Sequence, residues 1–313
     1  MGHKKTPHIF RNLSTACRIC KPPVTMALPT VYDSQYEIYH CVKAWFQKTH
    51  LSRSSNMLKH LIMIVFIKYL EEMLFTMKDS SVEITQITDS VFGIALWDPS
   101  WHSYNNCYLI NRDGKLLLLD CGKEDQGNLL IKALTQLHVE SDSIDVFIAT
   151  HGHSDHIGAS HLFQKAEKWI HRDDCDRLSH EQIEGFNTFN SNIGELYGLS
   201  YLLLGHHTQG SIALYDTTTH CLFCGDYICF FGDKLPHNGL LTFGQDLRDK
   251  TRAFMVSWSQ NSTDRHTYQF ETFVQGLKLL SSYKDAMFLA TGHGPILHKQ
   301  IADFLDELVS IDG

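Results

Sequence analysis

The spacing of apolar residues changes near Lys78. Residues 57–77 are apolar nearly all round and then amphipathic, which predicts a helix, whereas residues 1–56 show no clear periodicity. Beyond Lys78 the apolar runs are short and separated by turn residues, and they predict strands at 82–87, 91–96, 107–110 and 116–119. The pattern therefore predicts an N-terminal extension of unassigned role, residues 1–77, followed by one domain, residues 78–313.

Helices and strands are expected to alternate through the rest of the chain. Asp113-Gly114 predicts a hairpin turn, and four apolar residues at helical spacing predict a helix at 130–137 with Asp125 as its N-cap. The later expected elements are strands at 144–149, 169–170, 202–204, 211–215, 221–224 and 287–290, and helices at 157–166 and from about residue 300. A polar, partly helical insert is expected near 233–265. This order predicts an α+β fold with two sheets packed face to face and helices outside.

Charge is distributed unevenly. The first 76 residues carry ten Lys+Arg against four Asp+Glu, and the remaining residues carry 17 against 31. A domain that is this acidic repels phosphate backbones, so we expect a small-molecule substrate and no nucleic-acid partner.

The cysteines and apolar runs favour a reduced, cytoplasmic protein. Nine cysteines are scattered without a disulfide pattern, and no apolar segment follows the basic start. The longest apolar run, residues 61–67, is too short to span a membrane. Cys221 and Cys224 are expected to point to opposite faces of one strand, and the role of Cys17 and Cys20 stays open.

The strongest chemical signal is Thr-His-Gly-His-Ser-Asp-His at residues 150–156. His151 and His153 can reach one metal ion from a single turn, while Asp155 and His156 can face a second ion. Packing alone does not explain four such polar side chains after a buried strand, because burying them without partners costs a few kcal/mol each.

Four further short motifs stand before and after this segment along the chain. They are Leu-Asp-Cys-Gly at 119–122, Gly-His-His-Thr-Gln-Gly-Ser at 205–211, Phe-Cys-Gly-Asp at 223–226 and Gly-His-Gly-Pro at 292–295. Together with residues 150–156 they resemble the signature of the metallo-β-lactamase superfamily, and the resemblance covers roughly residues 82–297. It implies a four-layer αββα sandwich.

The resemblance also implies a two-metal site. One ion would take His151, His153 and His207, the other would take Asp155, His156 and His293, and Asp226 would bridge them with a hydroxide. Alignment on Thr-Gln-Gly-Ser selects His207 and leaves His206 as a neighbour. The donors suit two Zn²⁺ ions, although iron or manganese also accepts them.

Catalytic roles are expected for three residues. Asp155 and Asp226 would hold the ions around the nucleophile, and Tyr227 would hydrogen-bond the substrate carbonyl or the intermediate; a strand-end packing role for Tyr227 is the alternative. Asp120 is expected to orient a ligand histidine. Aromatic residues at the mouth would favour an apolar acyl chain: Trp97, Trp101, Phe230 and Phe231.

Three differences from other branches of this superfamily narrow the expected class of reaction. Asp226 stands where true β-lactamases lack a bridging carboxylate, and His153 stands where flavin-linked diiron reductases usually carry glutamate. The chain ends 20 residues after His293, which leaves no room for the helical domain of glyoxalase II-type thioesterases. A lactone or ester hydrolase is therefore expected. The alternatives are a thioester hydrolase, a β-lactamase, a mononuclear-iron sulfur dioxygenase or a non-catalytic binding module, and a homodimer is left open.

Overall fold

The structure is a computed structural model that describes residues 81–232, 234–237 and 239–311. The chain divides into residues 1–78 and residues 79–313, and the described residues all belong to the second unit. The helix predicted at 57–77 and the Cys17–Cys20 pair lie outside the described residues.

Two seven-stranded sheets form the centre of the described unit. The first sheet takes its strands in chain order: β1 (Val82–Thr88), β2 (Val91–Asp98), β3 (Ser103–Arg112), β4 (Lys115–Leu119), β5 (Val146–Ile148), β6 (Glu167–His171) and β7 (Phe186–Phe189). The second sheet has the order β12-β14-β13-β11-β10-β9-β8, from β8 (Ile193–Leu196), β9 (Leu199–Leu203), β10 (Ile212–Asp216), β11 (Cys221–Gly225), β12 (Leu241–Thr242), β13 (Phe288–Thr291) and β14 (Ile296–His298).

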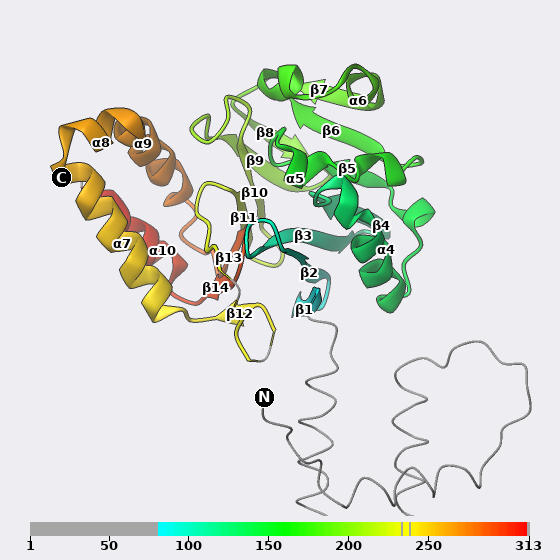
Figure 1. Cartoon of the computed structure of the whole chain (residues 1–313), viewed down its shortest axis with the longest axis horizontal. Coiled ribbons are helices and arrows are strands. Elements are labelled where there is room, and N and C mark those ends of the chain that lie inside the picture. Colours follow the sequence, from blue (N-terminus) through cyan, green and yellow to red (C-terminus); the bar gives the residue numbers. More distant parts are fainter. Residues whose placement is uncertain (1–80, 233, 238, 312–313) are drawn as a thin grey trace, which may run out of the picture. The chain divides into compact units, whose positions relative to one another are not determined.

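Helices cover the outer face of each sheet (Figure 1). Beside the first sheet lie α4 (Gly127–Gln136), α5 (Ser154–Ile157) and α6 (His180–Gly185), and beside the second lie α7 (Gln245–Gln260), α8 (Ser262–Thr267), α9 (Phe270–Leu280) and α10 (Ile301–Ser310). The expected four-layer αββα sandwich is thus confirmed.

Three apolar clusters separate the four layers. The inner cluster joins the facing sides of the sheets and includes Tyr108 on β3 and Phe223 on β11, whose rings lie 5.1 Å apart. An outer cluster packs α4 on the first sheet, and another packs α9 and α10 on the second. Cys221 belongs to the inner cluster and Cys224 to an outer one, so the prediction that they face opposite sides is confirmed.

Parallel pairing places several strand ends at one edge of the sandwich. In the first sheet β4, β5 and β6 run parallel, and in the second β11 runs parallel to β13. The segments that follow such strands meet at the carboxyl edge, where ligand sites form in sheets of this kind. All five predicted motifs contribute residues near these ends.

Two local predictions are wrong. The helix expected at 157–166 is only the four-residue α5 followed by a 3₁₀ turn, Ser160–Leu162. The reason is close packing of Gly158 on the segment after β4, because a Cβ at Gly158 would lie 2.5 Å from the Glu124 nitrogen. Asp125 is not the N-cap of α4, because a 3₁₀ turn at Glu124–Gln126 makes Gln126 the cap.

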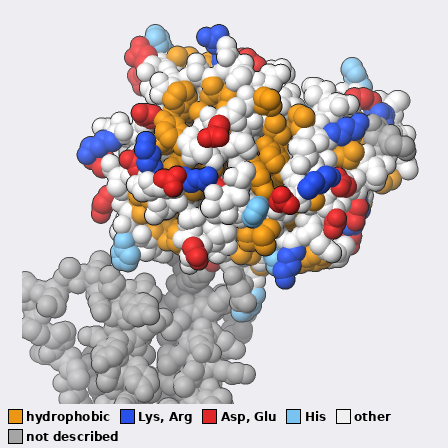
Figure 2. All heavy atoms as spheres, turned by 180° about the vertical axis from the view of Figure 1, so that it is seen from behind, with side chains coloured by type: hydrophobic (Ala, Val, Ile, Leu, Met, Phe, Trp, Pro, Cys, Tyr) orange, Lys and Arg blue, Asp and Glu red, His pale blue; other side chains and the backbone are white. Residues whose placement is uncertain are grey.

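None of the helices among the described residues is long and apolar enough to cross a membrane. On the face shown in Figure 2, acidic and basic side chains are interspersed among apolar ones.

Candidate metal centre

The segment after β5 carries four of the predicted ligands. His151 directly follows the buried Thr150, His153 is the N-cap of α5, and Asp155 and His156 lie within that short helix. The His151 Nε2 atom lies 3.1 Å from the His153 Nδ1 atom. The one-residue gap therefore turns both imidazoles toward one point, as the motif predicts.

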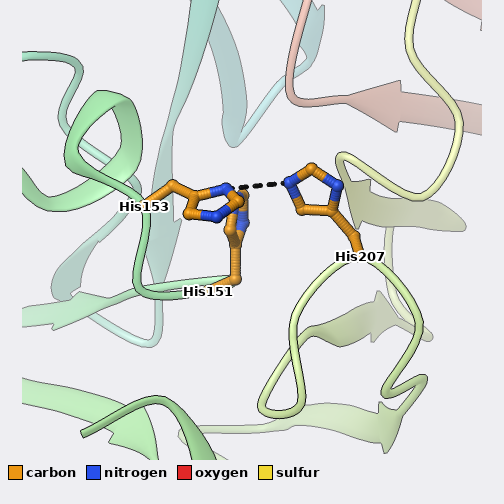
Figure 3. Close-up of side chains that lie close together, drawn as sticks. All are labelled: His151, His153 and His207. Carbon is orange, nitrogen blue, oxygen red and sulfur yellow. Dashed lines mark hydrogen bonds between the residues drawn. The ribbon is translucent and has the colours of Figure 1, made fainter. Parts of the chain in front are cut away.

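His207 reaches the same point from the loop between β9 and β10. Its Nε2 atom lies 2.9 Å from the His153 Nδ1 atom, and the three side chains point toward one another in Figure 3. We call His151, His153 and His207 the three-histidine cluster; one ring nitrogen from each lies within 4.8 Å of the others.

Burial keeps two of these imidazoles neutral. It holds the pKa of His151 well below its usual range, an effect that neighbouring His156 reinforces. Burial also lowers the pKa of His207 to about 4, although Asp226 opposes this shift. A neutral imidazole has the free lone pair that metal coordination requires.

A second group of side chains lies beside the first. Asp226 follows β11, His293 follows β13, and together with Asp155 and His156 they form what we call the aspartate–histidine cluster. The Asp155 Oδ2 atom lies 3.4 Å from His293 Nε2 and 3.5 Å from His156 Nε2. Both clusters combine donors of the types that bind transition metals.

Asp226 lies between the two clusters. Its Oδ2 atom is 3.4 Å from the Nε2 atom of His207 and 3.9 Å from that of His151. The same oxygen is 3.1 Å from His293 Nε2, and Oδ1 is 3.2 Å from His156 Nε2. One carboxylate thus faces donors of both clusters, which is the arrangement expected of a bridging ligand.

Unpaired buried atoms show that the aspartate–histidine cluster suits a cation. Asp155 Oδ2, His156 Nε2 and Asp226 Oδ1 are all buried and form no well-aligned hydrogen bond, although His156 Nε2 lies 3.2 Å from Asp226 Oδ1 and 3.5 Å from Asp155 Oδ2. Burying such atoms without a partner costs a few kcal/mol each, and a metal ion would satisfy all three. Gly292 allows the close approach, because a Cβ there would lie 2.0 Å from Asp226 Oδ1.

Electrostatics within this cluster favours ionised carboxylates. Burial alone would raise the pKa of Asp226, but the His156 and His293 side chains outweigh it and hold that pKa well below its usual range. Burial would lower the pKa of His156, yet the Asp226 and Asp120 carboxylates raise it well above its usual range. Positive charge is therefore stabilised at this point, and a metal ion can supply it in place of a proton.

Supporting contacts orient the ring nitrogens. The Asp120 Oδ2 atom lies 2.8 Å from His156 Nδ1, which is the contact predicted for Asp120. Thr150 donates to Asp120 from both its backbone nitrogen and its hydroxyl. The Tyr104 carbonyl lies 3.1 Å from His293 Nδ1. These contacts leave Nε2 of His156 and His293 facing the cluster.

Sequence reasoning missed Asp174. This fully buried residue follows β6, and its carboxylate accepts hydrogen bonds from the backbone nitrogens of Gly152 and Gly210. No motif spacing marks it, because it lies 21 residues beyond His153 in the segment Arg172–Arg177, whose five Asp and Arg residues resemble a solvated turn. Its position directly after a parallel neighbour of β5 was the available signal.

The predicted catalytic contact of Tyr227 is not what the structure shows. Its hydroxyl donates to the Phe273 carbonyl at 2.5 Å, and its ring stacks on Phe273 in the cluster beneath α9. Gly276 leaves room for this hydroxyl, since a Cβ there would lie 2.0 Å from it. The packing alternative describes Tyr227 better. His206 likewise turns away, with Nε2 2.7 Å from the Tyr268 carbonyl.

Two of the four predicted mouth aromatics lie beside the centre. The rings of Trp101 and Phe231 lie 5.8 and 4.5 Å from the His293 ring, and both side chains are at least half exposed. Lys123 lies over the Trp101 ring. Phe230 is instead buried under the second sheet, and Trp97 is half-buried between the sheets.

Comparisons with known proteins agree with this arrangement. The family model of the metallo-beta-lactamase superfamily matches residues 102–172. A Drosophila melanogaster protein described as a beta-lactamase-like protein 2 homolog is 34% identical over 77 residues, 24% of this chain and 26% of that protein. The aligned segment thus spans about a quarter of the fly protein.

Solved structures share the fold at low sequence identity. A flavoprotein from Thermotoga maritima superposes with a TM-score of 0.58 at 19% identity, over 73% of this chain and 60% of its own length. A metallo-beta-lactamase from Pontibacter korlensis gives 0.51 at 16% identity, over 74% of this chain and 98% of its own. The family match over the His-x-His segment shows that this part of the chain is similar to the metallo-β-lactamase superfamily, and the structural likenesses show that the described unit shares the fold of these proteins.

Proposed function

We propose that this protein is a binuclear metal-dependent hydrolase that attacks a carbonyl, with lactones or esters as its substrate class. The observation that carries the proposal is Asp226, which faces donors of both clusters and has an unpaired buried oxygen. With Asp226 counted in both, each cluster offers four donors, the number that zinc takes in proteins.

We propose Zn²⁺ as the metal. The five imidazoles and two carboxylates suit zinc, and iron fits the same donors, so the choice rests on elemental analysis. When bound, two divalent ions would lower the pKa of a shared water and polarise a substrate carbonyl.

The side chains around the clusters define the rest of the chemistry. Asp120 and the Tyr104 carbonyl hold the His156 and His293 rings in orientation, so the donors need not reorganise during turnover. Asp226 is a poor proton donor, because neighbouring positive charge keeps its carboxylate ionised. The Tyr227 hydroxyl is bonded to the Phe273 carbonyl. Because neither of these two side chains offers a proton, we propose that the leaving group departs as an alkoxide or takes its proton from water.

Because the leaving group would take its proton from water, a lactone or an ester is a better candidate substrate than a β-lactam. An alcohol leaves more readily without an acid than an amine nitrogen does, because the amine nitrogen must be protonated as it departs. Trp101 and Phe231 add an exposed aromatic surface beside His293 that can bury an apolar acyl chain. Longer-chain substrates are therefore expected to bind better than short ones.

The test is kcat/KM across acyl-homoserine lactones, simple esters, a glutathione thioester and a chromogenic cephalosporin. Asp226→Ala serves as the inactive control. We expect lactones or esters to be the best substrates, by at least about tenfold over the cephalosporin, or about 1.4 kcal/mol in transition-state binding. A tenfold preference for the cephalosporin or the thioester would instead favour those hydrolase classes.

A matched pair of variants tests the acyl surface. Trp101→Ala should raise KM for a long-chain lactone about tenfold and leave a short-chain lactone nearly unchanged, because only the long chain reaches the ring. Phe254→Ala removes a similarly exposed aromatic side chain from α7 and should change neither value. Equal effects of Trp101→Ala on both substrates would contradict this assignment.

A further inference from the structure

Asp174 stands between the two loops that carry the three-histidine cluster. It lies in the 3₁₀ helix Arg172–Arg177 that follows β6, and its side chain is completely buried. Among the described residues it belongs to neither candidate metal cluster. A buried carboxylate is costly unless it is well bonded, so its partners indicate what it does.

Its partners are confined to those two loops and to Arg177. Oδ2 accepts hydrogen bonds from the Gly152 nitrogen at 2.7 Å and from the Thr208 hydroxyl at 2.6 Å. Oδ1 accepts one from the Gly210 nitrogen at 2.8 Å. Gly152 separates His151 from His153, and Thr208 directly follows His207. One carboxylate thus fixes the distance between the His-x-His turn and the loop of the third histidine.

The glycines of both motifs pack closely against Asp174, Gly210 on its carboxylate and Gly152 on its backbone. A Cβ at Gly210 would lie 2.7 Å from the Asp174 Cγ atom, and a Cβ at Gly152 would lie 3.0 Å from the Asp174 carbonyl oxygen. Both separations are shorter than a relaxed van der Waals contact, so the loops can approach Asp174 only where glycine stands.

An amide cannot replace this carboxylate. Asparagine has one oxygen, so its NH₂ group would face either the Gly210 or the Gly152 nitrogen, and both of these are donors. The negative charge also matters, because the Arg177 Nη1 atom lies 3.2 Å from His153 Nε2 while Arg177 Nε lies 3.5 Å from Asp174 Oδ1. Asp174 thereby offsets a cation that stands next to a proposed metal ligand.

We propose that Asp174 is a positioning residue for the three-histidine cluster, so that it sets metal affinity at that cluster and not at its neighbour. In the aspartate–histidine cluster the direct support is Asp120, which contacts His156 and reaches His151 only through the Thr150 hydroxyl. The chain therefore orients its two proposed metal positions through two different buried aspartates. This inference rests on the proposed binuclear centre but not on its substrate.

The experiment measures the two stepwise dissociation constants for Zn²⁺ by competition with a chromophoric chelator, in wild type and in Asp174→Asn. We expect the variant to raise one constant about 10- to 100-fold, the range found for contacts that orient metal ligands, and to leave the other within about threefold. Cobalt substitution identifies the weakened position, because the spectrum of the remaining site should match that of His153→Ala.

Two further variants control for general destabilisation. Asp216→Asn alters an equally buried aspartate, which is paired with Arg112 between the sheets, and should lower the melting temperature without changing either constant. Asp120→Asn should weaken the opposite position more strongly, because Asp120 contacts His156 directly and His151 only through Thr150. If Asp174→Asn fails to fold, Thr208→Val removes one hydrogen bond to Asp174, keeps the charge, and should raise the same constant about fivefold.

The outcomes separate the two proposals. Wild-type protein that binds fewer than two ions refutes the binuclear centre itself. Wild type that binds two, with Asp174→Asn affecting both constants equally or neither, overturns the positioning role alone. Selective weakening of the position shared with His153 supports it.

Discussion

Asp226→Ala is expected to weaken both metal positions in one step. Its oxygens lie 3.4 Å from His207 Nε2 on one side and 3.2 Å from His156 Nε2 on the other. Each of the other six clustered side chains belongs to one cluster only. Removal of this carboxylate therefore deletes one of four donors at each position, whereas removal of Asp155 deletes a donor at one.

The size of the effect follows from this geometry. A four-donor zinc site in a protein contributes roughly 10–16 kcal/mol, so one donor accounts for about 3 kcal/mol and about a hundredfold in the dissociation constant. Asp226→Ala should thus raise both zinc constants about a hundredfold and reduce turnover to background. Asp155→Ala, the matched control, should raise only one of them.

Elemental analysis after dialysis and chelator competition provide the measurement. We expect about two ions per wild-type chain, about one in Asp155→Ala and fewer than one in Asp226→Ala. Retention of one tightly held ion by Asp226→Ala, with the other lost, would show that this carboxylate serves a single position and would refute the bridging assignment.

Three further predictions concern individual side chains. His207→Ala should lose one metal equivalent and abolish activity. The His206 ring contacts the Tyr268 carbonyl instead, so His206→Ala should keep both ions and hold kcat within about threefold of wild type. The reverse result in metal analysis would exchange the roles of the two histidines. Tyr227→Phe should lower stability by about 1 kcal/mol in thermal unfolding and leave kcat within about twofold, and a hundredfold loss of kcat would restore its catalytic role. The pKa of His207 is about 4 in the folded state and 6.5 in the unfolded state. As the pH falls, the His207 imidazole of the metal-free chain is therefore protonated in the unfolded state before it is protonated in the folded state. Relative to His207→Asn, the wild type should therefore lose about 2 kcal/mol of unfolding free energy between about pH 6.5 and pH 4, after allowance for the partial exposure of His207. The measurement is urea unfolding across this pH range, and equal pH profiles of wild type and variant would contradict the prediction.

The sequence predicts the parts of the centre that lie next to strand ends. His151 and Asp226 each lie one residue beyond an apolar run, so local pattern places them at a sheet edge, and the structure brings all seven predicted residues together. Their roles as ligands stay predictions that metal analysis must test.

What sequence could not predict depends on contacts across the fold. The direction of the Tyr227 side chain is decided by Gly276 on α9, which lies 49 residues away along the chain and leaves room for the ring. The helix expected at 157–166 fails because Gly158 packs on the segment after β4. Asp174 joins two loops that lie 56 residues apart in sequence, between His151 and His207, and neither loop's spacing signals its presence.

The clustered side chains come from both halves of the sandwich. His151, His153, Asp155 and His156 follow the first sheet, whereas His207, Asp226 and His293 extend from the second. Bound ions would therefore join the two halves at this edge, and a folded protein that binds metal at a thousand times the dissociation constant gains about 4 kcal/mol. Metal starvation would then raise the fraction of unfolded chain. Because proteases degrade unfolded chains, the lifetime of the protein in the cell would become shorter. Abundance of this protein would thus report the metal supply of its compartment as well as the rate of its synthesis.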